Sequence, residues 1–259
     1  MPASATRFTH AIVRRPAASA IHNLRSVDRG APDIDGLCRE HAAYVDMLTR
    51  LGLTVDVLPP LDAFPDSLFV EDPALVFPEG AIVLRPGAAS RLGEAEHLRP
   101  ALASRFDRIL ELTDGFADGG DVLRTPDVVH VGLSARTDET GATALAGLLA
   151  ALGYRASIVR PPAGVLHLKT ACSLVDDGTL LATRAMADAH LFPGLDVIVI
   201  PDGEEPAANL LRVNDVVMVA AGFPRTAEML ARRGHDVRAL ALDEVMKLDA
   251  GLSCMSLRW

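Results

Sequence analysis

The apolar residues of the chain follow a pattern that recurs along its length. Three segments each combine the end of an amphipathic helix, a glycine and a short apolar strand. They are Leu48–Leu58, Leu149–Val159 and Leu230–Leu240. Their glycines stand where a helix commonly ends in the left-handed conformation that glycine adopts without strain; these are Gly52, Gly153 and Gly234. The pattern predicts a repeated helix–strand unit.

Helices are predicted before the first two of these glycines, because apolar residues recur there at steps of three and four. The positions are Ile34, Leu37, His41, Tyr44, Val45, Leu48 and Leu51 in the first helix, and Ala142, Leu145, Leu148, Leu149 and Leu152 in the second. Asp138 is suited to cap the second helix. Weaker copies of the unit are Glu94–Arg105 followed by Ile109–Leu112, and Ala185–Leu191 followed by Val197–Ile200. The chain thus holds five units at a spacing of roughly 40–50 residues, which is typical of repeat architectures.

Turn residues between short β-rich runs predict one hairpin for each unit. Four of them are Ala74–Phe77 with Ala81–Leu84, Val122–Arg124 with Val128–Val131, Ser173–Val175 with Thr179–Ala182, and Leu210–Val213 with Val216–Val219. The fifth requires the chain ends, Phe8–Arg14 and Ser253–Trp259, to pair and close a ring. We therefore expect an α/β fold of five β-β-α-β units about a pseudo-fivefold axis. It forms one domain over residues 1–259 with a flexible start at residues 1–6. An ordinary α/β sandwich is the alternative.

Composition narrows the classes of partner. The 259 residues are 49% apolar, which is ample for a large core, and the net charge is −9 without a block of like charges. Phosphate binding needs a basic face, so no nucleic-acid partner is expected, whereas a small cationic ligand suits an acidic protein. No apolar run reaches the roughly 18 residues that span a bilayer, and no secretory signal is visible. We expect no membrane partner.

The cysteines are few and odd in number: Cys38, Cys172 and Cys254. Such a set does not form a disulfide framework, which indicates a reduced, cytoplasmic protein with free thiols. No cluster of histidines and cysteines has the spacing of metal ligands, so no metal is expected.

Cys254 and His167 are candidates for catalysis. Cys254 ends an Ala-Gly-Leu-Ser-Cys run in which small residues let the backbone approach a ligand closely. A thiolate is a strong nucleophile when a nearby positive charge lowers the thiol pKa, although a buried structural cysteine is the commoner role. His167 alternates with Leu166 and Leu168 as in a strand. That setting would point it toward the ring axis as a general acid and base, and the alternative is a hydrogen-bonded core histidine.

Two acidic pairs lie where they could reach the same axis. Glu71 and Asp72 follow an apolar pair, and Asp118 and Asp121 flank two glycines before a strand. Successive strand residues point to opposite faces, so one member of each pair can face a central pocket. Buried carboxylates need a partner, and a guanidinium with its planar fork of five N–H donors is a natural one. The alternative is a turn or cap role, above all for Asp121.

Arg91 and Arg136 are predicted in loops. Loop arginines are commonly solvated, and their functional use would be to clamp a carboxylate bidentately.

Together these motifs resemble the dimethylarginine dimethylaminohydrolase family of the pentein (guanidine-modifying) superfamily over nearly the whole chain. In chain order the matching motifs are Phe64–Ser67, Phe69–Pro73, Arg85–Gly87, Asp118–Val122, Gly132–Thr137, Leu166–Thr170, Ala207–Asn209 and Ser253–Cys254. Each motif alone is weak, but their joint order is highly specific. The resemblance implies a five-bladed α/β propeller, the pentein fold, which agrees with the repeat.

The resemblance also implies a role for each site residue. Cys254 matches the nucleophile, His167 the general acid and base, and Asp118 the carboxylate that orients His167 and contacts the guanidinium. Asp72, with Glu71 beside it, matches the other guanidinium-binding carboxylate. The remaining matches bind the amino-acid end of the substrate: Arg91 and Arg136 the α-carboxylate, and Asp66 with the backbone carbonyls of Leu24 and Leu248 the α-amine.

The implied reaction hydrolyses Nω-methylated arginine to citrulline and an alkylamine through an S-alkylthiouronium on Cys254, without a cofactor. One alternative acts on free arginine or another guanidine, but Glu71 stands where arginine deiminases and amidinotransferases typically carry arginine. The other is a guanidine-binding protein without activity, against which the joint presence of Cys254, His167 and Asp118 argues. A small cationic molecule is the expected partner, and a homodimer is compatible with the sequence.

Overall fold

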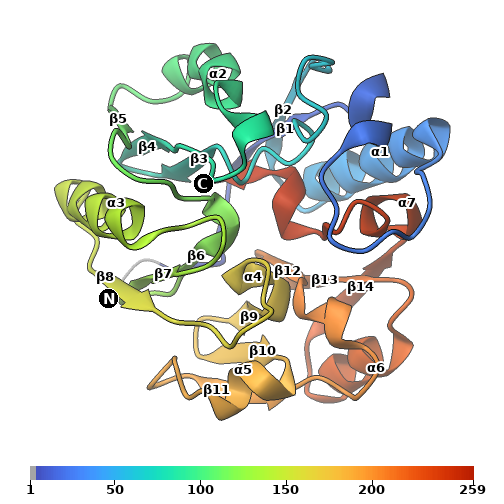
Figure 1. Cartoon of the computed structure of the whole chain (residues 1–259). Coiled ribbons are helices and arrows are strands. Elements are labelled where there is room, and N and C mark those ends of the chain that lie inside the picture. Colours follow the sequence, from blue (N-terminus) through green and yellow to red (C-terminus); the bar gives the residue numbers. More distant parts are fainter. Residues whose placement is uncertain (1–3) are drawn as a thin grey trace.

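The five predicted units form five three-stranded sheets within residues 4–259, the part of the chain that the computed structural model describes (Figure 1). In each sheet an antiparallel strand pair is joined, after a helical segment, by a third strand that pairs in parallel with the second. The sheets follow one another around a ring (Figure 1). The predicted pentein propeller is therefore confirmed.

The strands of the five sheets are, in order, β15 (Leu257–Arg258), β1 (His10–Arg14) and β2 (Thr54–Leu58); β3 (Ala74–Phe77), β4 (Gly80–Val83) and β5 (Ile109–Glu111); β6 (Val122–Arg124), β7 (Val129–Gly132) and β8 (Ala156–Val159); β9 (Cys172–Asp176), β10 (Thr179–Ala182) and β11 (Asp196–Val199); β12 (Leu211–Val213), β13 (Val216–Ala220) and β14 (Asp236–Leu240). The α-helices are α1 (Ile34–Arg50), α2 (Arg99–Ala103), α3 (Glu139–Ala151), α4 (Leu168–Ala171), α5 (Arg184–Asp188), α6 (Pro224–Arg232) and α7 (Asp243–Met246).

The two ends of the chain close the ring, as predicted. Strand β15 pairs antiparallel with β1, with Ile12 opposite Leu257. Of the start predicted to be flexible, residues 1–3 lie outside the described residues. The backbone N–H of Ala5 donates to Asp177 Oδ1 at 2.9 Å, and the Thr6 carbonyl accepts from the Asn214 N–H. The N-terminal segment thus contacts the fourth and fifth sheets.

Local signals explain where the long helices begin and end. The carboxylates of Asp33 and Asp138 accept hydrogen bonds from backbone N–H groups three residues later and so cap α1 and α3. The second unit differs from the prediction of one helix over 94–105. Its segment divides into a 3-10 turn (Glu94–His97) and the short α2, because Pro100 has no N–H for a helix that continues from before it.

The apolar core lies between the helices and the sheets. The inward residues of α1 and α3, such as Tyr44, Leu48, Leu145 and Leu149, are fully buried. None of the helices in residues 4–259 is long and apolar enough to cross a membrane. Buried polar and charged residues, Asp66, Asp72, Arg91 and Asp118 among them, lie outside the apolar clusters of this core and set the position of the site.

Candidate active site

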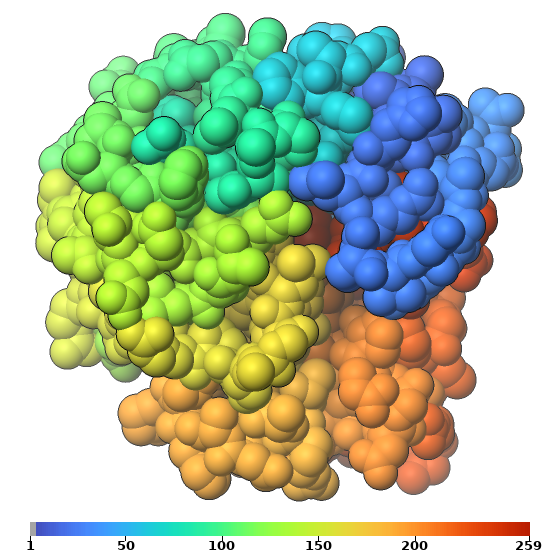
Figure 2. All heavy atoms as spheres, in the orientation of Figure 1, coloured from blue at the N-terminus to red at the C-terminus, as the bar shows by residue number. Residues whose placement is uncertain are grey.

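A cavity of about 60 Å³ collects the predicted site residues, with Glu71 as the one exception. Its walls include Leu24, Asp66, Asp72, Arg91, Asp118, Arg136, His167, Leu248 and Cys254. These residues come from segments spread over the whole chain. In Figure 2 the molecule is hollowed near its centre, where red C-terminal atoms show at depth between the blue N-terminal segment and the green and yellow segments.

Cys254 lies in a 3-10 turn, Ser253–Met255, that is held from the side by Asn209. The Asn209 Oδ1 atom accepts from the Ser253 N–H at 3.0 Å, and its Nδ2 group donates to Cys254 Sγ at 3.7 Å. A Cβ at Gly251 would lie 2.5 Å from Asn209 Cγ, so the glycine of the Ala-Gly-Leu-Ser-Cys run makes this approach possible. The sequence placed Asn209 in a motif without a role, and only the fold shows that it touches Cys254.

The thiol of Cys254 is protonated at neutral pH in this structure. Burial raises its pKa, the carboxylates of Glu71 and Asp72 add to the effect, and together they bring the pKa to about 12. The Gly251 N–H and Lys169 oppose the shift more weakly. A cation that enters the cavity would reverse the balance and favour the thiolate.

The predicted strand setting of His167 is wrong. His167 is the N-cap residue of the one-turn helix α4, where its backbone N–H donates to Thr170 Oγ1 at 3.3 Å. Asp121 Oδ1 accepts from the Leu168 N–H at 2.9 Å, which gives Asp121 the cap role considered for it. These local polar bonds satisfy backbone groups that a strand would have left to a ladder partner. The imidazole nevertheless faces the cavity.

Asp118 orients the imidazole of His167. Its Oδ2 atom lies 3.0 Å from His167 Nε2, and its Oδ1 atom accepts from the Gly87 N–H at 2.8 Å. Burial by itself lowers the pKa of His167, but Asp72, Asp118 and Asp121 outweigh it and raise the pKa to about 9. His167 is therefore an imidazolium at neutral pH, able to give a proton.

Asp72 is fixed by two donors. Its Oδ1 atom accepts from the Gly120 N–H at 3.0 Å and its Oδ2 atom from Arg91 Nη1 at 2.5 Å. Burial alone would raise the pKa of Asp72, but His167 and Arg91 lower it, so the carboxylate stays ionised. A buried, ionised and oriented carboxylate is suited to a guanidinium.

The two arginines predicted to bind a carboxylate differ in how many guanidinium N–H groups they have left for a ligand. Arg91 is buried and its Nε and Nη2 groups donate to Glu94 at 2.8 and 2.7 Å, so its fork cannot clamp a second carboxylate bidentately. The Arg136 guanidinium makes no hydrogen bond within residues 4–259 and keeps its donors for a ligand. Glu94 was missed in the sequence, although its spacing of three from Arg91 is typical of helical ion pairs.

Two glycines allow the acidic groups and the imidazole to meet. A Cβ at Gly119 would lie 1.9 Å from the Glu71 carbonyl oxygen, and one at Gly120 would lie 2.8 Å from His167 Nδ1. Any larger residue at Gly119 or Gly120 would push the segment that holds Asp118 away from Glu71, Asp72 and His167.

The predicted amine site is occupied by a side chain of the protein. Asn23 Nδ2 donates to the Leu24 carbonyl at 2.9 Å and to the Leu248 carbonyl at 3.2 Å. The Leu24 N–H donates to Asp66 Oδ1 at 3.2 Å, and burial raises the pKa of Asp66 to about 6. Asn23 thus occupies two of the three groups predicted to bind an ammonium, and the third, Asp66, accepts from the Leu24 N–H. Nothing in the sequence pattern indicated the role of Asn23.

Glu71 does not face this cavity, which corrects the expectation that it contacts substrate. Its Oε1 atom binds Lys169 Nζ at 2.6 Å and Arg258 Nη2 at 3.3 Å, and its Oε2 atom accepts from Ser253 Oγ at 2.9 Å. In the turn that precedes β3, Asp72 therefore takes the cavity side and Glu71 the other.

One possible ligand atom each from Asp72, Asp118 and His167 lies within 4.8 Å of the other two, close enough for the three residues to share a metal ion. Sequence spacing could not indicate this group, because its members come from three separate segments. As the site stands, Arg91 and the imidazolium neutralise the two carboxylates, and a protonated imidazole offers no lone pair to a metal.

Named relatives align with nearly the whole chain. No protein-family model matches it. The N(G),N(G)-dimethylarginine dimethylaminohydrolase of Pseudomonas aeruginosa is 38% identical over 97% of this chain and 100% of its own length. The protein of the same name from Streptomyces coelicolor is 34% identical over 96% of each chain.

Solved structures agree with these relatives. The Pseudomonas aeruginosa enzyme, as a Cys-to-Ser variant complexed with citrulline, superposes with a TM-score of 0.94 at 37% identity and covers 98% of this chain and 100% of that one. A His-to-Gly variant of a dimethylarginine dimethylaminohydrolase, solved as an adduct with S-methyl-L-thiocitrulline, has the same TM-score and identity and covers 97% of this chain and 100% of that one. The N-terminal domain of the arginine dihydrolase ArgZ from Cyanobacteria reaches a TM-score of 0.85 at 19% identity over 96% of this chain and 97% of that one, which shows the fold alone.

Proposed function

Because the chain belongs to the dimethylarginine dimethylaminohydrolase family, we propose that it hydrolyses Nω-methylated arginine to citrulline and an alkylamine. Asymmetric dimethylarginine and monomethylarginine are the substrates. The family resemblance in the sequence is confirmed by the relatives. One observation carries the assignment to residues: a cysteine, an imidazolium with its carboxylate, and a second oriented carboxylate line one cavity.

The guanidinium of the substrate is held by the two carboxylates. Asp72 and Asp118 are each fixed by a backbone N–H and a charged side chain, which leaves further lone pairs for the planar N–H groups of the substrate. Arg136 binds the α-carboxylate, with Arg91 contributing one remaining N–H. Asp66 and the carbonyls of Leu24 and Leu248 accept the α-ammonium once the Asn23 amide gives way.

Catalysis proceeds by covalent exchange at the guanidinium carbon. The substrate cation lowers the thiol pKa, Cys254 releases its proton to solvent, and the thiolate attacks to give a tetrahedral adduct. His167 transfers its proton to the departing alkylamine, whose C–N bond breaks and leaves an S-alkylthiouronium. The now neutral His167 takes a proton from water, which attacks the same carbon. The C–S bond then breaks as the hydroxyl proton of this second adduct passes to the Cys254 sulfur, so citrulline leaves and the thiol is restored.

The test is a substrate panel with citrulline detection. We expect citrulline from asymmetric dimethylarginine and monomethylarginine, little from free arginine, and none from dimethylarginine with the Cys254→Ser variant, which keeps the fold. The His167→Ala variant should lose turnover and retain a covalent adduct visible by intact mass spectrometry. Citrulline from arginine alone would refute the substrate class, and full activity of Cys254→Ser would refute the nucleophile.

A reducing, cytoplasmic location belongs to the same proposal. Its support is the state of the three cysteines, which are all free thiols, including the nucleophile. A homodimer remains a prediction that sedimentation equilibrium would test.

A further inference from the structure

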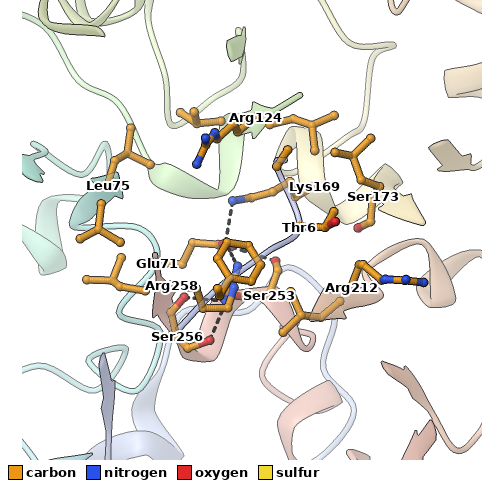
Figure 3. Close-up of a pocket in the computed structure, with 18 of the residues that line it drawn as sticks. Thr6, Glu71, Leu75, Arg124, Lys169, Ser173, Arg212, Ser253, Ser256 and Arg258 are labelled. Carbon is orange, nitrogen blue, oxygen red and sulfur yellow. Dashed lines mark hydrogen bonds and ion pairs between the residues drawn. The ribbon is translucent and has the colours of Figure 1, made fainter. Parts of the chain in front are cut away.

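A second cavity, of about 130 Å³, lies next to the cavity that Cys254 lines and shares a wall with it. We call the cavity with Cys254 the nucleophile pocket. The lining of the second cavity includes residues of the first strand of every sheet, namely β3, β6, β9, β12 and β15, so it lies on the ring axis. Sequence neighbours divide the two cavities. Glu71, Lys169 and Ser253 face this one, whereas Asp72, Thr170 and Cys254 face the other. We refer to it as the axial cavity (Figure 3).

The charge in the axial cavity is opposite to that of the protein. Its charged lining consists of Arg124, Lys169, Arg212 and Arg258 against the single carboxylate of Glu71. The chain as a whole carries a net charge of −9. Glu71 Oε1 forms ion pairs with both Lys169 and Arg258, so two cations share one carboxylate.

Arg124 has no carboxylate partner at all within residues 4–259. Its guanidinium lies over the rings of Phe77 and Tyr154 at 5.8 and 5.2 Å from their centroids. Arg212 likewise forms no ion pair among the described residues and donates its Nε–H to the Asn214 carbonyl at 2.6 Å. Both arginines are half-buried rather than fully exposed, so their unpaired positive charge is only partly offset by solvent and the cluster lacks an anion.

Donors that line the cavity are also left without acceptors. The Nε groups of Arg124 and Arg258 and the hydroxyl of Ser173 are buried without a hydrogen-bond partner in the part of the chain that is described. Ser173 is only 6% exposed and belongs to β9. Figure 3 shows Arg124 above and Ser173 to the right of the central pair of Lys169 and Glu71, with Arg258 beside Glu71.

We infer that the axial cavity is a binding site for a small oxyanion, a carboxylate or phosphate group, held by Arg124, Lys169, Arg258 and Ser173. An oxyanion supplies the acceptors that the unpaired donors lack and offsets the excess positive charge. The size limits the ligand, because a water takes about 30 Å³ and the cavity therefore holds roughly four waters or one small anion. Apolar walls from Leu75, Val122 and Leu211 suit a carboxylate with a short aliphatic chain.

The experiment measures anion binding to the full chain by calorimetry and by the thermal unfolding midpoint. Phosphate and butyrate are titrated separately at constant ionic strength, which distinguishes an inorganic oxyanion from a carboxylate with an apolar chain. A ligand at roughly ten times its Kd should raise the midpoint by about 3 °C, because only the folded chain offers the site. Saturable binding of either anion is the expected result.

Variants locate the site. Arg124→Gln and Ser173→Ala should each weaken Kd, the former by about tenfold or more, as loss of a charge-assisted hydrogen bond predicts. Ser173→Ala keeps the test valid if Arg124→Gln unfolds, because it removes one hydroxyl and no ring contact. Arg184→Gln is the matched control, since it removes one exposed positive charge elsewhere and should leave Kd unchanged.

A separate variant distinguishes the axial cavity from the nucleophile pocket. Binding that survives Arg136→Gln and is weakened by Arg124→Gln supports the inference. Binding that is lost in Arg136→Gln but intact in Arg124→Gln and Ser173→Ala places the anion in the nucleophile pocket and overturns it. Absence of saturable binding of both anions to the parent chain also overturns it, whatever the outcome of the citrulline assay.

Discussion

Replacing Asp118 with asparagine removes one charge from the site and leaves the side chain nearly the same size. In the structure Asp118 Oδ2 lies 3.0 Å from His167 Nε2, and both side chains are largely buried, at 2% and 13% exposed. Solvent therefore screens the interaction little. The asparagine can still accept from the Gly87 N–H, so the loop should stay in place.

The magnitude follows from the strength of one buried bond to a charged group. Such a bond stabilises the charged form by about 1.5–3 kcal/mol, and one pKa unit corresponds to about 1.4 kcal/mol. The His167 pKa of about 9 should therefore fall to about 7–8 in Asp118→Asn. Asp72 and Asp121 still act on the imidazole, which keeps the pKa from falling further.

The assay is an NMR titration of the His167 imidazole in the Cys254→Ser background, where no turnover occurs. Since the folded pKa is raised, the imidazolium is present below about pH 9 and is lost as pH rises through that value, and the variant should lose it at lower pH. Asp118→Glu keeps the charge and should retain most of the elevation. Asp127→Asn, an exposed carboxylate, is the control without effect. An unchanged His167 pKa in Asp118→Asn would refute this account of how His167 holds its proton.

Three further predictions concern the nucleophile and the glycine pair. Asn209→Ala should lower kcat by about 10–100-fold with little change in KM, because it removes the bonds to Ser253 and Cys254 Sγ; an unchanged kcat would contradict that role. Ultraviolet titration of the free protein should show no Cys254 thiolate below about pH 10, since the thiol pKa is about 12; a thiolate signal near neutrality, absent from Cys254→Ser, would contradict it. Gly119→Ala should destabilise by about 1–3 kcal/mol or more in denaturant unfolding, because its Cβ would meet the Glu71 carbonyl. Gly147→Ala, an exposed helix position with open space, should instead stabilise by about 0.5–1 kcal/mol, and equal effects of the two changes would argue against the close approach.

Much of the fold followed from periodicity. Apolar spacing located α1 and α3, and the glycines after them have φ values of +92° and +93°, the left-handed conformation predicted for a helix end. The closing hairpin of β15 and β1 was also predicted, because four complete hairpins left only the chain ends to make a fifth. The short elements were predicted less accurately. His167 caps a one-turn helix where the alternation of apolar and polar residues predicted a strand. A pattern of four residues is too short to tell strand from helix, and a few local hydrogen bonds decide the conformation.

The amino-acid sequence by itself determined the repeat, the class of fold and, through motifs in a specific order, the family and most of the polar residues that line the cavity. Only the tertiary structure decided which carboxylate of the Glu71–Asp72 pair shares a cavity with Cys254, that Asn209 contacts Cys254, and that Asn23 occupies the predicted amine site. It also brought Arg124, Lys169 and Arg258 around one carboxylate. The reason is physical: periodicity reports which side of an element is buried, whereas charge pairing depends on distances across the ring axis that no local pattern contains.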